Sequence, residues 1–235
     1  MCLHGWFGSA EGWGPFVDSL DTDAFMYAFM DYRGYGGEKA TRGEYSIKEI
    51  ASDALALADA LGWKTFSALG HSMGGIAAQR LLVDAPGRVE KLVGVSPVPA
   101  AGVPFDDATW GFFTSATETP ASRYGIIDLT TGKRLTKTWI EKMVAHSLET
   151  STKEAFAAYL VSWAKTDFSA EVQGNATPVL VIAGEHDPAL GPDAMKGTLM
   201  KNYPNATLEV FANAGHYAPF ETPVALATSV ERFLR

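Results

Sequence analysis

Short runs of apolar residues recur along the chain, separated by stretches in which apolar positions follow a helical period. Five of these runs are predicted strands: residues 24–32, 65–71, 91–98, 178–187 and 206–215. Most of them are nearly continuous in apolar residues, which is typical of strands buried on both faces of a parallel sheet.

Helical patterns fill the intervals between these runs. Segments 46–62, 73–85 and about 219–234 are predicted helices, and Ser46 with Glu49 three residues later has the capping-box pattern that begins a helix. This alternation of strands and helices predicts an α/β fold with a mostly parallel central sheet flanked by helices on both faces.

One region breaks the alternation. Between residues 103 and 173 no convincing strand is present, whereas 137–149 and 151–167 have helical patterns. Ser151 with Glu154 is a second capping-box pattern. We interpret 103–173 as a helical cap or lid inserted into a core made of 1–102 and 174–235. The alternative is that these are long crossover helices packed on the sheet.

Composition narrows the possible partners. The net charge of −8 and the lack of a Lys/Arg cluster argue against binding to nucleic acid or to an anionic membrane surface. The single cysteine, Cys2, excludes an internal disulfide and a cysteine-based metal cluster. No signal peptide or membrane-spanning run is evident, so a cytoplasmic location is the default expectation. The sequence does not predict the oligomeric state.

A candidate nucleophile lies where a predicted strand meets a predicted helix, in the stretch Gly70-His71-Ser72-Met73-Gly74. A sharp turn there would strain the backbone of Ser72 and crowd its neighbours, so Gly70 and Gly74 must be small. The hydroxyl of Ser72 would then project from the edge of the sheet. The N–H of Met73, at the start of the helix, could donate to an oxyanion.

Partners for such a serine follow later in the chain. Asp187 ends one predicted strand, and His216 lies in the glycine-flanked loop at the end of the next. A serine, an acid and a histidine in this order are expected when the nucleophile lies on a strand–turn–helix elbow. Near the N-terminus, the His4-Gly5 turn places the N–H of Trp6 as a second oxyanion donor.

Taken together, these features resemble the α/β-hydrolase fold superfamily, in its branch of serine hydrolases and esterases with a helical cap. The matching features are His4-Gly5, Asp31–Gly36 (DYRGYG), Gly70–Gly74, Asp187 and Gly215-His216. The resemblance implies that Ser72, His216 and Asp187 are catalytic, with no metal and no organic cofactor. Members usually carry two further strands before the His-Gly turn, so the N-terminal strands are expected to be shortened or missing.

Other polar residues are expected to be structural. We expect Asp31 and Arg33 to pair and brace the loop after their strand, and His4 to support the oxyanion turn. His186 is expected in a loop, His146 on an exposed helix face, and Asp106 and Asp107 in a loop or at a helix N-cap. No pair of histidines has metal-ligand spacing, so no metal site is predicted.

The aromatic residues of 103–173 predict an apolar and partly covered pocket. Candidate lining residues are His71, Trp110, Phe113, Trp139, Met143, Tyr159, Trp163 and Tyr217. Arg123 and Lys137 are the nearest candidates for pairing with a substrate carboxylate, although nothing in the sequence aims them at Ser72.

The predicted function is hydrolysis of small or medium apolar carboxylic esters by water, through an acyl-enzyme on Ser72. Two alternatives stay open. The same three catalytic residues serve lactone, enol-lactone or C–C hydrolases of ring-fission products, although the C–C enzymes usually add an Arg and an Asn. A catalytically silent receptor with this fold is the other alternative, which the intact Ser, Asp and His make less favourable.

Overall fold

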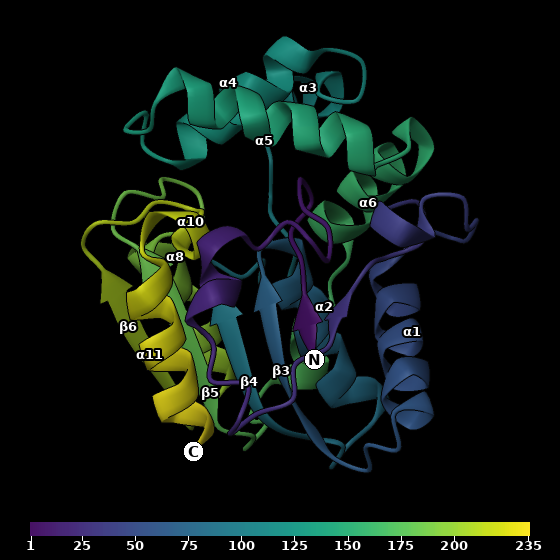
Figure 1. Ribbon diagram of the computed structural model, residues 1–235, viewed down its shortest axis with the longest axis vertical. Helices are drawn as coiled ribbons and strands as arrows, with labels where there is room; N and C mark the ends of the chain where they lie inside the picture. The colour runs from purple at the N-terminus through teal and green to yellow at the C-terminus, as the bar shows by residue number, and fades with distance from the viewer.

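The computed structural model describes all 235 residues and contains one six-stranded sheet (Figure 1). The strands are β1 (Cys2–Leu3), β2 (Phe29–Met30), β3 (Phe66–His71), β4 (Val89–Val95), β5 (Val179–Gly184) and β6 (Ala206–Phe211). They are parallel and follow the order β2-β1-β3-β4-β5-β6. The predicted α/β fold with a parallel central sheet is confirmed.

Each predicted strand overlaps one observed strand, but several end earlier than predicted. Predicted strand 178–187 ends at Gly184, and 206–215 ends at Phe211. The residues beyond these ends, 185–187 and 212–215, lie in loops at the carboxyl edge of the sheet, and only Asp187, Ala214 and Gly215 among them are buried.

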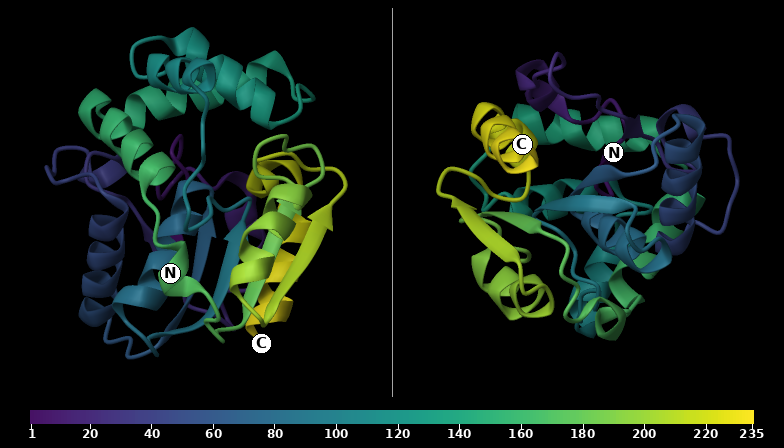
Figure 2. Two further views of the ribbon diagram at one scale, coloured as in Figure 1. Left: turned by 180° about the vertical axis from the view of Figure 1, so that it is seen from behind. Right: turned by 90° about the horizontal axis from the view of Figure 1, so that it is seen from below.

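Alternate strand residues face two separate cores, as the pleat of a strand requires. Leu92, Val179 and Val181 belong to a large core of 48 residues, whereas Val93, Leu180 and Ile182 belong to a smaller core of 13. The large core is covered by α1 (Ile47–Ala60), α2 (Met73–Asp84), α8 (Pro192–Gly197) and α9 (Leu199–Asn202). The smaller is covered by the 3₁₀ helix η1 (Gly14–Ser19), α10 (Ala218–Glu221) and α11 (Pro223–Leu234). Figure 2 shows the sheet between these layers.

The predicted helix at about 219–234 is two helices, α10 and α11, because Pro223 begins a new helix after Thr222. Of the two hydrogen bonds in the capping box predicted at Ser46, one is confirmed: the Ser46 hydroxyl accepts from the N–H of Glu49. The Glu49 carboxylate, however, accepts from the N–H groups of Glu44 and Tyr45 rather than from Ser46.

Residues 103–173 form a helical layer, which we define as α3 (Asp107–Ser115), α4 (Pro120–Thr130), α5 (Lys137–Thr150), α6 (Lys153–Lys165) and α7 (Ser169–Val172). Helices α3, α4 and α5 lie across the carboxyl ends of the strands (Figure 1). Asp106 caps α3, as predicted. The predicted capping box at Ser151 is wrong: Thr152 caps α6, and the Ser151 hydroxyl instead donates to the carbonyl of Ser147.

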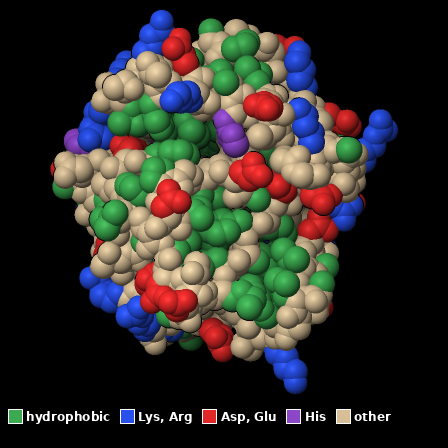
Figure 3. All heavy atoms as spheres, in the orientation of Figure 1, with side chains coloured by type: hydrophobic (Ala, Val, Ile, Leu, Met, Phe, Trp, Pro, Cys, Tyr) green, Lys and Arg blue, Asp and Glu red, His purple; other side chains and the backbone are tan.

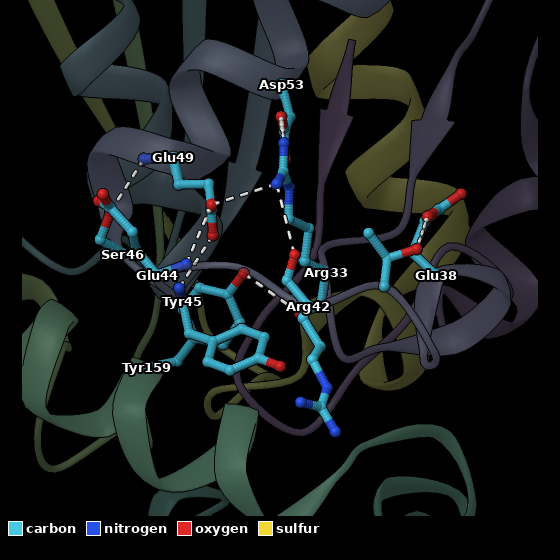
Figure 4. A network of polar contacts seen from close by, with 10 residues as sticks. Arg33, Glu38, Arg42, Glu44, Tyr45, Ser46, Glu49, Asp53 and Tyr159 are labelled. Carbon is cyan, nitrogen blue, oxygen red and sulfur yellow. Dashed lines mark hydrogen bonds and ion pairs between the residues drawn. The ribbon is translucent and has the colours of Figure 1, made fainter.

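The predicted Asp31–Arg33 pair is also wrong. Arg33 donates to both carboxylate oxygens of Asp53 on α1, each at 2.8 Å, and lies 3.5 Å from Glu49 (Figure 4). The carboxylate of Asp31 is already occupied, because it accepts from the N–H groups of Ala10 and Gly37. Both oxygens of the Asp53 carboxylate are available for a bidentate hydrogen bond with the guanidinium of Arg33. The oxygens of Asp31 already accept from backbone N–H groups.

Candidate active site

Ser72 lies at the turn between β3 and α2, with a left-handed backbone conformation of φ 54° and ψ −116°. A Cβ at position 70 would overlap the carbonyl of Gly74, and a Cβ at position 74 would overlap the carbonyl of Leu3. Three backbone hydrogen bonds hold the strained turn. The N–H of Ser72 donates to the carbonyl of Val95, and the carbonyl of Ser72 accepts from the N–H groups of Gly75 and Val98. The crowding predicted for both glycines is therefore observed.

Asp187 and His216 lie in contact with each other. The Asp187 carboxylate accepts from His216 Nδ1 at 2.6 Å, and its other oxygen accepts from the N–H groups of Ala189 and Leu190, both at 3.0 Å. Burial alone would raise the pKa of Asp187, but His216 and these backbone donors outweigh it and hold the pKa below its ordinary value. The carboxylate is thus ionised, and its hydrogen bond to Nδ1 orients the imidazole of His216.

His71 supports the histidine loop from the side of the elbow. Its Nε2–H donates to the carbonyl of His216 at 2.8 Å, and burial lowers the pKa of His71 to about 3. His4 likewise donates from Nδ1 to the carbonyl of Gly5 at 2.8 Å, and burial lowers the pKa of His4 to about 4. His4 therefore supports the Gly5 turn as predicted, and both imidazoles are neutral at pH 7.

The turn at Gly5 packs directly against the elbow, since a Cβ on Gly5 would lie 3.2 Å from Ser72 Cβ. The N–H groups of Trp6 and Met73, the predicted oxyanion donors, have no acceptor within the chain. Each of the two adjoining turns therefore carries one backbone N–H that has no acceptor within the chain.

A cavity of 23 lining residues lies between the core and the helical layer, and both Ser72 and His216 line it. None of its lining residues is Asp, Glu, Lys or Arg. Figure 3 shows one face of the molecule, where hydrophobic side chains gather beside a hollow between the helical layer and the core. The site is thus an apolar cavity with hydrogen-bonding groups concentrated around Ser72.

Five of the predicted pocket residues line this cavity: His71, Phe113, Met143, Trp163 and Tyr217. The other three do not. Tyr159 is fully buried and donates to the carbonyl of Arg33, Trp110 lies beneath the Lys165 ammonium, and Trp139 packs against Tyr217 and Phe220. These aromatic side chains contact other parts of the fold and are not among the residues that line the cavity.

Neither predicted carboxylate partner reaches the cavity. Arg123 is buried inside the helical layer, where it donates to Ala116 O and Ser147 Oγ and stacks 3.7 Å from the ring centroid of Phe156. Lys137 is exposed and lies 3.5 Å from Glu141. His146, predicted to be exposed, is half-buried and hydrogen-bonded to Ser9.

The prediction missed several cavity residues. Val98 ends the predicted strand 91–98, and it lies just beyond the carboxyl end of β4, where ligands commonly bind in α/β sheets. The position of Val98 at the end of a predicted strand therefore indicated that it could line the site. Phe105, Ile126 and Leu190 also line the cavity and had no comparable signal.

No group of three or more His, Cys, Asp or Glu side chains is arranged to hold a metal ion. None of the helices combines the length and the hydropathy that crossing a bilayer would require.

A family profile described as the alpha/beta hydrolase fold matches residues 1–223. The chain belongs to this family. It is 31% identical over 219 residues to 2-hydroxymuconate semialdehyde hydrolase of Pseudomonas putida, covering 87% of this chain and 75% of that protein. It is 27% identical to pimeloyl-[acyl-carrier protein] methyl ester esterase of Nitrosomonas europaea, covering 94% and 88%.

The fold is also that of a solved esterase from Exiguobacterium antarcticum, with a TM-score of 0.89 at 20% sequence identity. The match covers 100% of this chain and 91% of that structure. Family membership and fold together support hydrolase activity on small-molecule substrates.

Proposed function

We propose that this α/β hydrolase is a serine hydrolase that cleaves uncharged carboxylic esters with small or medium apolar acyl groups. The observation that carries the proposal is the 2.6 Å contact between Asp187 and His216 Nδ1, behind a cavity that His216 and Ser72 both line. The esterase among the sequence relatives supports the same reaction class.

In this proposal, the reaction begins when His216 Nε2 accepts the proton of the Ser72 hydroxyl as the oxygen attacks the ester carbonyl. Asp187 stabilises the imidazolium that forms. The N–H groups of Trp6 and Met73 bind the tetrahedral oxyanion, and a donor of this kind contributes about 3 kcal/mol. His216 then protonates the leaving alkoxide, which departs as an alcohol and leaves an acyl group on Ser72.

Water completes the cycle. His216 removes a proton from a water molecule as that water attacks the acyl-enzyme, and Ser72 leaves with the proton that His216 returns. The products are a carboxylic acid and regenerated enzyme. We propose that the helical layer acts as the cap of this site, because its residues Phe113, Met143 and Trp163 form part of the cavity wall.

The charge of the cavity favours a neutral substrate. A carboxylate-bearing ring-fission product would meet no Lys or Arg among the lining residues, and Asp187 lies directly behind His216. Burying an unpaired charge costs several kcal/mol. The ester reaction is therefore favoured over C–C cleavage of such anions. A neutral lactone, which needs the same donors and base, is the second candidate.

The test compares two p-nitrophenyl esters of similar length, the butyrate and the hemisuccinate. The butyrate should be hydrolysed, and kcat/KM for the anionic ester should be at least about 100-fold lower. Ser72→Ala should abolish turnover of the butyrate while circular dichroism and thermal unfolding stay unchanged.

A fluorophosphonate probe should form one covalent adduct, at Ser72. Turnover that survives in Ser72→Ala would rule out this nucleophile. Folded wild-type protein with neither turnover nor labelling would instead support the silent receptor, and equal rates for the two esters would remove the preference for neutral substrates.

A further inference from the structure

Glu221 holds the backbone on both sides of His216. Its carboxylate lies at the end of α10, is 2% exposed, and accepts from the N–H of Gly215 at 2.8 Å and from the N–H of Tyr217 at 3.0 Å. These two residues directly precede and follow His216. One buried carboxylate therefore fixes the peptide groups that carry the imidazole.

The helical layer supplies the counter-charge for this carboxylate. Arg134, in the connection between α4 and α5, donates to Glu221 at 2.9 Å and to the carbonyl of Asn213 at 3.3 Å. An ionised donor and an ionised acceptor make hydrogen bonds stronger than neutral ones. Arg134 thus ties the histidine loop to residues 103–173 and compensates the burial of Glu221.

Further contacts join the same two segments. The N–H of His216 donates to the carbonyl of Thr130 at 3.1 Å. Gly215 lies so close to the end of α4 that a Cβ there would be 2.7 Å from Thr131 Cα. On the opposite side, His71 donates to the carbonyl of His216. The peptide groups around His216 are therefore held by donors and acceptors from three separate elements.

This degree of restraint has a chemical purpose in a proton-transfer site. The imidazole must keep Nδ1 at Asp187 while Nε2 faces Ser72, and a displacement of about 1 Å in such a site can cost about 100-fold in rate. The loop itself is short and irregular, so its own backbone does not define the ring position.

We propose that Glu221 is the positioning residue for His216, and that Arg134 of the helical layer keeps its carboxylate in place. The proposal rests on the proposed function, since it assigns His216 as the base. It adds that the helical layer sets the geometry of the base as well as covering the cavity.

The decisive variant is Glu221→Gln, which keeps the size of the side chain but removes its charge and one acceptor oxygen. We expect kcat for p-nitrophenyl butyrate to fall at least about 10-fold, with KM within about twofold. The proton between His216 Nδ1 and Asp187 should give a downfield ¹H NMR signal, because the bond is short, and Glu221→Gln should shift or broaden it.

The matched control is Glu209→Gln. Glu209 lies on β6 and forms an ion pair with Arg232 on α11, away from the histidine loop. This variant should leave kcat and the downfield signal unchanged. Arg134→Met should reduce kcat less than Glu221→Gln does, and Arg134→Lys should restore part of the loss.

A folded Glu221→Gln protein with wild-type kcat and a wild-type downfield signal would overturn the proposal. If Glu221→Gln does not fold, Arg134→Met is the test. A wild-type kcat together with a wild-type downfield signal in Arg134→Met would then overturn the proposal. The downfield signal can be measured without turnover. A failure of the proposed function would appear as wild-type protein that is not labelled at Ser72. That result is distinguishable from a failure of this inference.

Discussion

Replacing Gly74 with alanine tests the packing of the turn at Ser72. A Cβ at position 74 would lie within 3.0 Å of Leu3 O, Leu3 C and His4 O, a separation that real Cβ atoms essentially never show. All three atoms belong to the backbone at the end of β1, so no side-chain rotation relieves the overlap. Either α2 or the Gly5 turn must move.

The size of the effect follows from that geometry. Overpacking of a well-packed site costs about 1–3 kcal/mol, and Gly74 lies at the upper end because only backbone can yield. A shift of about 1 Å between β1 and α2 would also separate the N–H groups of Trp6 and Met73, and misplacement on that scale can lower the rate about 100-fold. Gly74→Ala should therefore lose activity beyond its loss of stability.

Urea unfolding and kcat for p-nitrophenyl butyrate measure the two effects. The control is Gly111→Ala, in the middle of α3, where a Cβ would meet nothing within 4 Å. That variant should gain about 0.5–1 kcal/mol from helix propensity and keep its kcat. A Gly74→Ala protein with wild-type stability and kcat would refute the argument that crowding requires glycine at this turn.

The remaining predictions concern the buried histidines, the acid and one helix cap. Burial lowers the pKa of His4 to about 4 and that of His71 to about 3, from 6.5 in the unfolded chain. The unfolded state then binds more protons below pH 6.5, so the free energy of unfolding should fall by about 2 kcal/mol per histidine between pH 7 and pH 5. Urea unfolding measures this loss, and a flat profile over that window would contradict it. Asp187→Asn should lower kcat by about 10⁴-fold, because the ring loses the anion that fixes its tautomer; a variant within tenfold of wild type would exclude Asp187 as the acid. Thr152→Ala should lower the free energy of unfolding by about 1 kcal/mol by removing the N-cap of α6, and thermal unfolding that matches wild type would reject that cap.

The sequence predicted the sheet because β3, β4 and β5 are buried on both faces over most of their length, which leaves a nearly continuous apolar signal in each run. It predicted the capping of α1 because Ser46 acts on residues a few positions away. One of the errors arises from local competition for hydrogen bonds. At Ser151, the hydroxyl donates backwards to Ser147, so its neighbour Thr152 takes the capping position. A capping motif cannot show which of two adjacent hydroxyl residues is free.

Some residues of the candidate site are indicated by the local sequence pattern, whereas others depend on contacts between segments far apart in the chain. Ser72, Asp187 and His216 were predictable because each follows a strand of a parallel sheet, and the carboxyl ends of such strands meet at one edge. Glu221 and Arg134 gave no comparable signal, since 87 positions separate them in the chain and their contact depends on how the helical layer lies on the core. Arg123 shows the converse, because its charge suggested a substrate partner while packing placed it against Phe156 inside the layer. The motif therefore predicts the candidate reacting groups, whereas the contacts around His216 and the lack of charged residues in the cavity lining depend on tertiary packing. Variants of Glu221 and Arg134 consequently test the part of the chemistry that the motif does not encode.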